Sequence, residues 1–264
     1  MKNHIQLSAI ALALSVTGTT QAAISLGDVI GIDFGGTAAT PVADNYWNDF
    51  GAVGGNNTTL GLDHDEQSVN AYTVNLTDLV RLSDGASTGV GFTLVNSTGQ
   101  IAWDFDQSGA AGIEGDGGLI TAGGVNVYGD GLISNDASGR TTESGVDFFY
   151  VTYTGLDDGL TYDFVSGWDH GNSNFDTTWN VYSDSTFTTI VDTFTTDVTG
   201  DPGAGYGSFS SLSSSGGELY LGVTGDGGAA QIVVAAATLT AVPEPSAALL
   251  GGLGLLGLLG RRRR

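Results

Sequence analysis

The chain has 264 residues and no cysteine. Disulfide bonds, thiolate metal sites and cysteine nucleophiles are therefore excluded, so a folded body must be stabilised by its core. Proline is scarce as well, with four residues, and no Pro- or Ser-rich linker divides the middle of the chain. A single domain between the two ends is the simplest organisation, because single β-domains reach about 200–250 residues.

Basic residues are also few: seven Lys and Arg stand against 29 Asp and Glu. Lys2 and Arg261–Arg264 belong to the two ends, which leaves Arg81 and Arg140 between residues 23 and 241. Every acidic residue except Glu244 lies in that body, which is therefore strongly anionic. Such a surface repels phosphate backbones and anionic headgroups, so nucleic acid is excluded as a partner.

Sequence signatures of familiar hydrolases are missing too. The chain has no Gly-x-Ser-x-Gly elbow and no His-Glu-x-x-His zinc helix, and the body has two histidines, His64 and His170. We therefore expect no enzymatic activity. A carboxylate-dependent glycan-acting enzyme stays open as an alternative, because Asp pairs are too numerous for a catalytic pair to be chosen without distances.

Strand periodicity dominates what is present. Short runs rich in Val, Ile, Thr, Tyr and Phe are bounded by Gly, Asp, Asn or Ser, as is typical of β-strands. The expected strands are Asp28–Phe34, Val69–Leu76, Gly89–Val95, Val146–Thr154, Leu160–Gly167, Thr178–Tyr182, Glu218–Val223 and Ile232–Thr240. The 43 glycines suit the connecting turns, and 24 aromatic residues (4 Trp, 9 Tyr, 11 Phe) oppose disorder. The pattern predicts an all-β protein, with a single antiparallel β-sandwich or jelly roll over residues 23–241.

The N-terminal residues 1–22 have the pattern of a secretory signal peptide. Lys2 supplies the positive start, Ile5–Val16 the apolar region, and Thr20–Ala22 the small residues of a cleavage site. We expect export, with a mature protein that begins at Ala23.

The C-terminal residues 242–264 combine three features in order. Val242, Pro243, Glu244 and Pro245 form a segment whose prolines oppose a helix or a central strand, so an exposed hinge is expected. Residues 246–260 contain only Ser, Ala, Leu and Gly. As a helix this run would reach about 22 Å, short of a roughly 30 Å hydrocarbon core. Four arginines, Arg261, Arg262, Arg263 and Arg264, follow it and favour a cytoplasmic end, with the body outside.

This order of features resembles the PEP-CTERM sorting signal of Gram-negative bacteria, with Pro243, Glu244 and Pro245 as its motif. The resemblance implies a transient inner-membrane intermediate and exosortase, a membrane transpeptidase-like enzyme, as the partner that cuts near the motif. It also implies delivery to the cell envelope, the outer surface or the medium. An ordinary tail anchor is the alternative, but it leaves the Pro-Glu-Pro sequence unexplained.

Two segments of the body resemble β-sandwich families. Gly155–Phe164 resembles the strand-turn-strand element of fibronectin-III-like and carbohydrate-binding sandwiches, with Tyr162 as corner tyrosine above Leu156. Ile30–Gly36 followed by Asn45–Asn48 resembles the start of malectin-like and galactose-binding-like jelly rolls.

Candidate binding residues follow from chemistry. Aromatic rings beside amides and carboxylates suit sugars, so the candidate glycan-binding residues are Trp47, Asn48, Trp168 and Trp179, with a place in the core as the alternative for each tryptophan. Asp104, Asp106 and Ser108 fit part of a calcium loop, but Glu114 falls one position early, so an acidic turn explains them equally well. Ca²⁺ is the metal that such oxygen ligands would favour.

The sequence therefore predicts an exported, non-enzymatic protein of the envelope or matrix that contacts exopolysaccharide. A dedicated carbohydrate-binding module and a glycan-acting enzyme are the two alternatives.

Overall fold

The computed structural model describes residues 24–34, 46–49, 56–57, 62–63, 73–96, 100–106, 130–136, 147–169, 177–196, 204–225 and 232–244. Within these ranges every helix or strand assigned is a β-strand, as the all-β prediction requires. The expected signal peptide and the apolar run with its arginines lie outside the described residues. A helix long and apolar enough to cross a membrane is not found in the described ranges.

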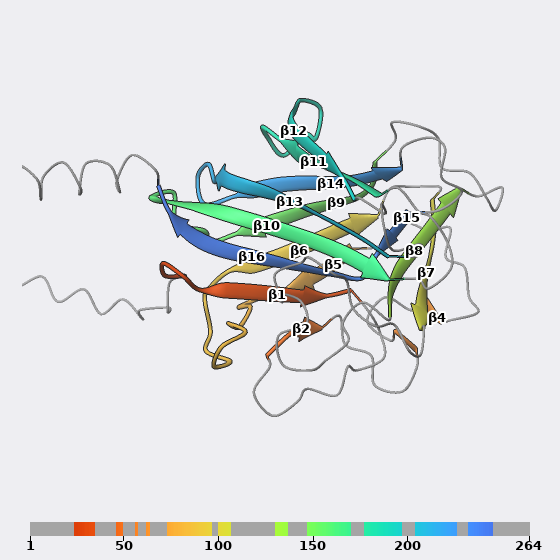
Figure 1. The fold of residues 1–264 in the computed structure, drawn as a ribbon, viewed down its shortest axis with the longest axis horizontal. Coiled ribbons are helices and arrows are strands. Elements are labelled where there is room, and N and C mark those ends of the chain that lie inside the picture. Colours follow the sequence, from red (N-terminus) through yellow and green to blue (C-terminus); the bar gives the residue numbers. More distant parts are fainter. Residues whose placement is uncertain are drawn as a thin grey trace, which may run out of the picture.

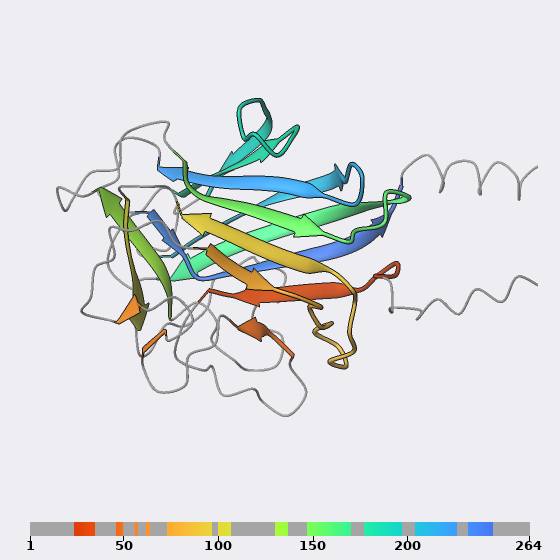
Figure 2. The same cartoon turned by 180° about the vertical axis from the view of Figure 1, so that it is seen from behind.

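Two large sheets form the body, and Figures 1 and 2 show them as face-to-face layers. The five-stranded sheet has the order β13 (Ala204–Ser213), β10 (Leu160–Asp169), β16 (Ala236–Pro243), β1 (Val29–Asp33), β2 (Asn48–Asp49). The six-stranded sheet has the order β12 (Ile190–Thr195), β11 (Thr177–Tyr182), β14 (Leu219–Gly225), β9 (Asp147–Thr154), β6 (Gly91–Asn96), β5 (Thr73–Leu76). Neighbouring strands are antiparallel except for the short parallel pair β1–β2.

Two smaller sheets complete the described strands. β15 (Ile232–Val234), β8 (Asp130–Asp136) and β7 (Gln100–Asp106) form one, and β3 (Asn56–Asn57) with β4 (Leu62–Asp63) forms the other. The predicted strand over 232–240 is therefore divided at Ala235 between two sheets. Ala235 takes the chain from one sheet to the other, with its N–H donating to the Gly167 carbonyl at 3.3 Å.

The core lies between the two large sheets because alternate residues of each strand face inward. In β9, Phe149, Val151 and Tyr153 are at most 1% exposed, while their chain neighbours Tyr150 and Thr152 are half-buried. Aromatic rings join the layers, and Phe164 of β10 meets Trp179 of β11 edge-on with ring centroids 4.8 Å apart. Each such side chain contributes about 1.5–3 kcal/mol of burial free energy, which compensates for the absence of disulfides.

The predicted corner tyrosine is confirmed. The Tyr162 hydroxyl donates to the Asp157 carbonyl at 3.0 Å and accepts the Asp157 N–H at 2.8 Å. The ring is fully buried, and Leu156 belongs to the same core. The two bonds close the turn between β9 and β10 and fix the point where β10 begins.

Replacing Tyr162 with Phe should therefore lower the free energy of unfolding by about 1–3 kcal/mol, because the buried turn loses one donor and one acceptor at once. Urea denaturation of a fragment covering residues 23–244 would measure the change. Tyr206→Phe is the matched control, since Tyr206 is a half-buried tyrosine of the neighbouring strand β13. Equal effects of the two substitutions would contradict a special role for the corner.

Candidate functional site

The first candidate site is the sorting segment, Val242–Pro245, and its first half belongs to the sheet. β16 runs on through Val242 and Pro243, which pair with Thr161 and Leu160 of β10. The expectation of a hinge that starts at Val242 is therefore wrong, and Glu244 is the first residue after the strand. Pro245 and the arginines lie outside the described residues.

The position of Pro243 has a simple physical reason. β16 is central in its sheet, but its register with β1 starts at Val29 opposite Thr240. Past Ala241 only β10 remains as a partner, so the last two residues have the environment of an edge strand. Proline is tolerated there because an edge position does not need its missing N–H.

Trp47 and Asn48, two of the candidate glycan-binding residues, lie beside β1. An added Cβ at Gly31 would stand 2.6 Å from Cε3 of Trp47, so the half-buried indole covers this glycine closely. The Asn48 amide donates to the carbonyls of Gly31 and Val80 at 2.9 and 3.0 Å, and its oxygen accepts the Val80 N–H at 2.8 Å. Asn48 thus joins β1 to the segment at Val80, a structural use of the hydrogen bonds that a sugar would need.

Trp179 lies in the core and is 1% exposed, which corrects its interpretation as a glycan-stacking ring. A buried indole has no face that a polymer can reach. For Trp168 the structure describes the backbone, which pairs with Gly205. The side chains of the candidate calcium ligands Asp104 and Asp106, and all of Ser108, lie outside what is described. Elsewhere in the described ranges, no cluster of three or more His, Asp or Glu is placed to hold a metal.

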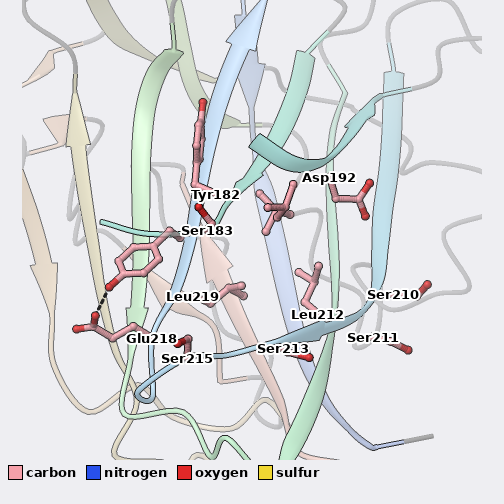
Figure 3. Close-up of a pocket in the computed structure, with 13 residues that line it drawn as sticks. Tyr182, Ser183, Asp192, Ser210, Ser211, Leu212, Ser213, Ser215, Glu218 and Leu219 are labelled. Carbon is pink, nitrogen blue, oxygen red and sulfur yellow. Dashed lines mark hydrogen bonds between the residues drawn. The ribbon is translucent and has the colours of Figure 1, made fainter. Parts of the chain in front are cut away.

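The second candidate site is a surface cavity of about 300 Å³, here called the serine groove. It opens where β11, β12, β13 and the start of β14 meet (Figure 3). Its floor is apolar, because Val181, Leu212 and Leu219 are at most 8% exposed. Its rim carries the exposed residues Ser183, Ser210, Ser211, Ser213 and Ser215.

Two irregular strand pairings shape this groove. The register of β10 with β13 shifts between Tyr162 and Phe164, and Ser211 has a positive φ of 58°. The Asp163 carboxylate accepts the Ser211 N–H at 2.8 Å and so holds this unusual backbone. A second shift separates Val181 from Tyr182 in the pairing of β11 with β12. Such bulges re-aim side chains, here at the edges of both sheets.

Carboxylates and a tyrosine add polar groups to the groove. Asp192 and Glu218 lie on opposite sides of it in Figure 3, and the Tyr220 hydroxyl donates to the Glu218 carboxylate. This bond raises the pKa of Tyr220, because the hydroxyl donates its proton to a carboxylate. The site is thus rich in hydroxyl groups and acceptors over an apolar floor.

The loop beside the groove is built on Asp184. Its carboxylate accepts the Thr186 N–H at 2.9 Å and the hydroxyls of Thr186 and Ser183, and the bond from the Thr186 hydroxyl contributes most to lowering its pKa. Phe187, at a positive φ of 51°, packs its ring against those of Tyr150 and Tyr182 at centroid distances of 4.4 and 5.5 Å. The loop is therefore anchored to the outer face of the six-stranded sheet.

No sequence argument led to the serine groove. Its lining comes from stretches of the chain between residues 181 and 220 that meet only after the strands pair. The available signal was the run Ser208-Phe209-Ser210-Ser211-Leu212-Ser213-Ser214-Ser215, in which serines surround two apolar residues.

Comparison with known proteins bears on the sorting segment. The family model of the PEP-CTERM protein-sorting motif matches residues 241–264. Neither the curated proteins nor the solved structures gave a match. The likeness to malectin-like jelly rolls accordingly rests on the sequence pattern alone. The chain thus carries, continuous with its β-sandwich, a PEP-CTERM protein-sorting motif, which indicates export and sorting by exosortase through a membrane-anchored intermediate.

Proposed function

We propose that this protein is a non-enzymatic component of the cell envelope or extracellular matrix whose β-sandwich associates with exopolysaccharide. The observation that carries the proposal is the continuity of β16 with the sorting motif, since it makes the folded sandwich the part that sorting delivers. Its anionic surface keeps such a body soluble and favours a polar, uncharged matrix over anionic partners.

The serine groove is the place where we expect a glycan to bind. Sugar rings present C–H faces to apolar surfaces and hydroxyls to directional hydrogen-bond partners. Val191, an exposed residue of the lining, supplies the first kind of surface, and the rim serines with Asp192 supply the second. The groove is favoured over Trp179 as a sugar site, because the indole of Trp179 is buried.

A glycan-acting enzyme is the second candidate, and the presence of Asp192 and Glu218 in one groove is what favours it. Glycosidases use such a pair across the scissile bond. The two functions differ in outcome: a binding protein leaves the chain length of the polysaccharide unchanged, whereas an enzyme shortens it.

Ser213→Tyr should weaken retention on purified exopolysaccharide from the native host at least about tenfold, because the larger ring fills the groove. A tenfold loss corresponds to about 1.4 kcal/mol of binding free energy. Affinity electrophoresis of the 23–244 fragment would measure the retention. Ser208→Tyr is the matched control: Ser208 is also an exposed serine of β13, but it does not line the groove.

Equal retention of the two variants would contradict glycan binding in the serine groove. A wild-type fragment that is not retained at all would contradict exopolysaccharide association. Shortened glycan after incubation, lost in Asp192→Asn, would replace binding by enzymatic activity.

A further inference from the structure

The sorting motif of this chain starts inside a β-sheet, as described above. Ala241 is held on both sides of β16: it pairs with Tyr162, its N–H donates to the Asp28 carbonyl at 3.0 Å, and its carbonyl accepts the Gly27 N–H at 2.8 Å. The next two residues, Val242 and Pro243, are paired with β10 alone. The end of the fold and the start of the processing site are therefore the same residues.

The β10 side of this pairing is the firmer one. Thr161 is 4% exposed and pairs on its other side with Ser213. The Leu160 N–H donates to the Asp157 carbonyl at 3.0 Å, within the turn that the Tyr162 hydroxyl closes. Val242, by contrast, is half-buried and Pro243 is exposed. When this pairing opens, the segment that moves is Val242–Pro243.

An enzyme that cuts a peptide bond must reach the backbone on both sides of it, and it binds substrates as extended strands through their N–H and C=O groups. A segment whose backbone is already paired in a sheet cannot offer those groups. We propose that Leu160 and Thr161 are positioning residues for sorting, and that exosortase cuts this chain only after Val242 and Pro243 have separated from β10.

This proposal rests on exosortase processing and adds a requirement for local opening. The terminal pairs of a strand open far more readily than the whole fold does. The separation therefore delays processing without preventing it. The Thr161 hydroxyl, which lies 3.5 and 3.4 Å from the carbonyl oxygens of Val242 and Pro243, adds to this hold.

A reversible cross-link tests the opening directly. Thr161→Cys together with Val242→Cys places two thiols on directly opposed residues of an antiparallel pair, at a spacing that a disulfide accepts. The chain has no other cysteine, so no competing disulfide can form within it. Expressed at full length in the native host, the oxidised double variant should keep its arginine tail and stay in the inner membrane. Addition of a reductant should restore processing, which mass spectrometry of the C-terminus would detect.

The single variant Val242→Cys is the control, because it has no partner thiol and its processing rate should not respond to reductant. Equal processing of the oxidised and reduced double variant would overturn the proposal. If the wild-type chain itself never loses the arginine tail, exosortase does not process this protein, and the present proposal is wrong as well. The two failures are distinguished by the wild-type result.

A second variant acts in the opposite direction and does not depend on cysteine chemistry. Insertion of Gly-Ser-Gly-Ser between Ala241 and Val242 keeps the Pro-Glu-Pro motif intact but moves Val242 and Pro243 out of their pairing with Thr161 and Leu160. Processing of the membrane intermediate should become about tenfold faster, which corresponds to about 1.4 kcal/mol of pairing removed. An unchanged or slower rate in a pulse-chase experiment would overturn the proposal.

Discussion

Replacing Trp179 with alanine is expected to lower the free energy of unfolding by about 3–5 kcal/mol, a large part of the stability of an ordinary domain. Trp179 is among the largest fully buried side chains, and its ring meets Phe164 across the interface between the sheets. No disulfide supports this core, because the chain has no cysteine. A cavity here would therefore remove contacts that join the two layers. Urea denaturation of the 23–244 fragment, followed by tryptophan fluorescence and circular dichroism, measures the change.

Trp179→Phe is the informative control. The indole Nε1 of Trp179 is buried and has no hydrogen-bond partner among the described residues. Phenylalanine removes that unsatisfied donor and keeps most of the apolar ring, so it should cost much less than alanine does. A loss below about 1 kcal/mol for Trp179→Ala would show that the ring is not the core anchor that its burial implies.

Strand prediction succeeded where side chains carry the signal. β9 and β10 are rich in aromatic and β-branched residues, and such a composition predicts a strand whatever its pairing partner is. The corner tyrosine was predictable for a related reason, since its partners are five residues away in the sequence. Local patterns specify local structure.

β12 and β13 are strands that the residue pattern did not predict, and they show the limit of prediction from local sequence. β13 reads AGYGSFSSLS, a sequence of mostly glycine and serine with weak β-propensity, and it is a strand because it pairs with β10 along most of its length. β12 lies at the edge of the six-stranded sheet, where Ile190 and Val191 are more than half exposed. β12 has no buried face, and in β13 the bulge places the buried residues Phe209 and Leu212 three positions apart, so neither strand shows regular alternation.

The candidate site was harder to predict for the same physical reason. The Asn-Tyr-Trp-Asn cluster has the composition of a sugar site, but the Asn48 amide is used by the backbone of Gly31 and Val80, partners 17 and 32 residues away. The serine groove depends on two register shifts, and no pattern in the sequence predicts them. The sorting motif, in contrast, is linear and was recognised from its order of features, although its pairing with β10 was not.

The second large effect concerns the sorting motif itself. Changing Pro243, Glu244 and Pro245 together to alanine should leave the whole protein in the inner membrane with Arg261–Arg264 attached. As a helix, the apolar run of residues 246–260 would reach only about 22 Å, short of the hydrocarbon core, so we expect it to be a poor permanent anchor. We expect the four arginines nevertheless to keep its end on the cytoplasmic side until the chain is cut. Membrane fractionation with mass spectrometry of the C-terminus would detect the retained tail, which the wild-type mature protein should lack.

The triple variant acts on pairing as well as on recognition. Alanine at position 245 restores a backbone N–H beyond the present end of β16 and so favours continuation of the strand. Pro243→Ala with Glu244→Ala, which keeps Pro245, is therefore the control that removes the motif without lengthening the strand. If both variants stay in the inner membrane, loss of the motif is the cause; if only the triple variant does, strand extension is the cause. An intact arginine tail on the mature, externally located wild-type protein would instead mean that the segment is a plain tail anchor, because the chain would then have reached its final location without being cut.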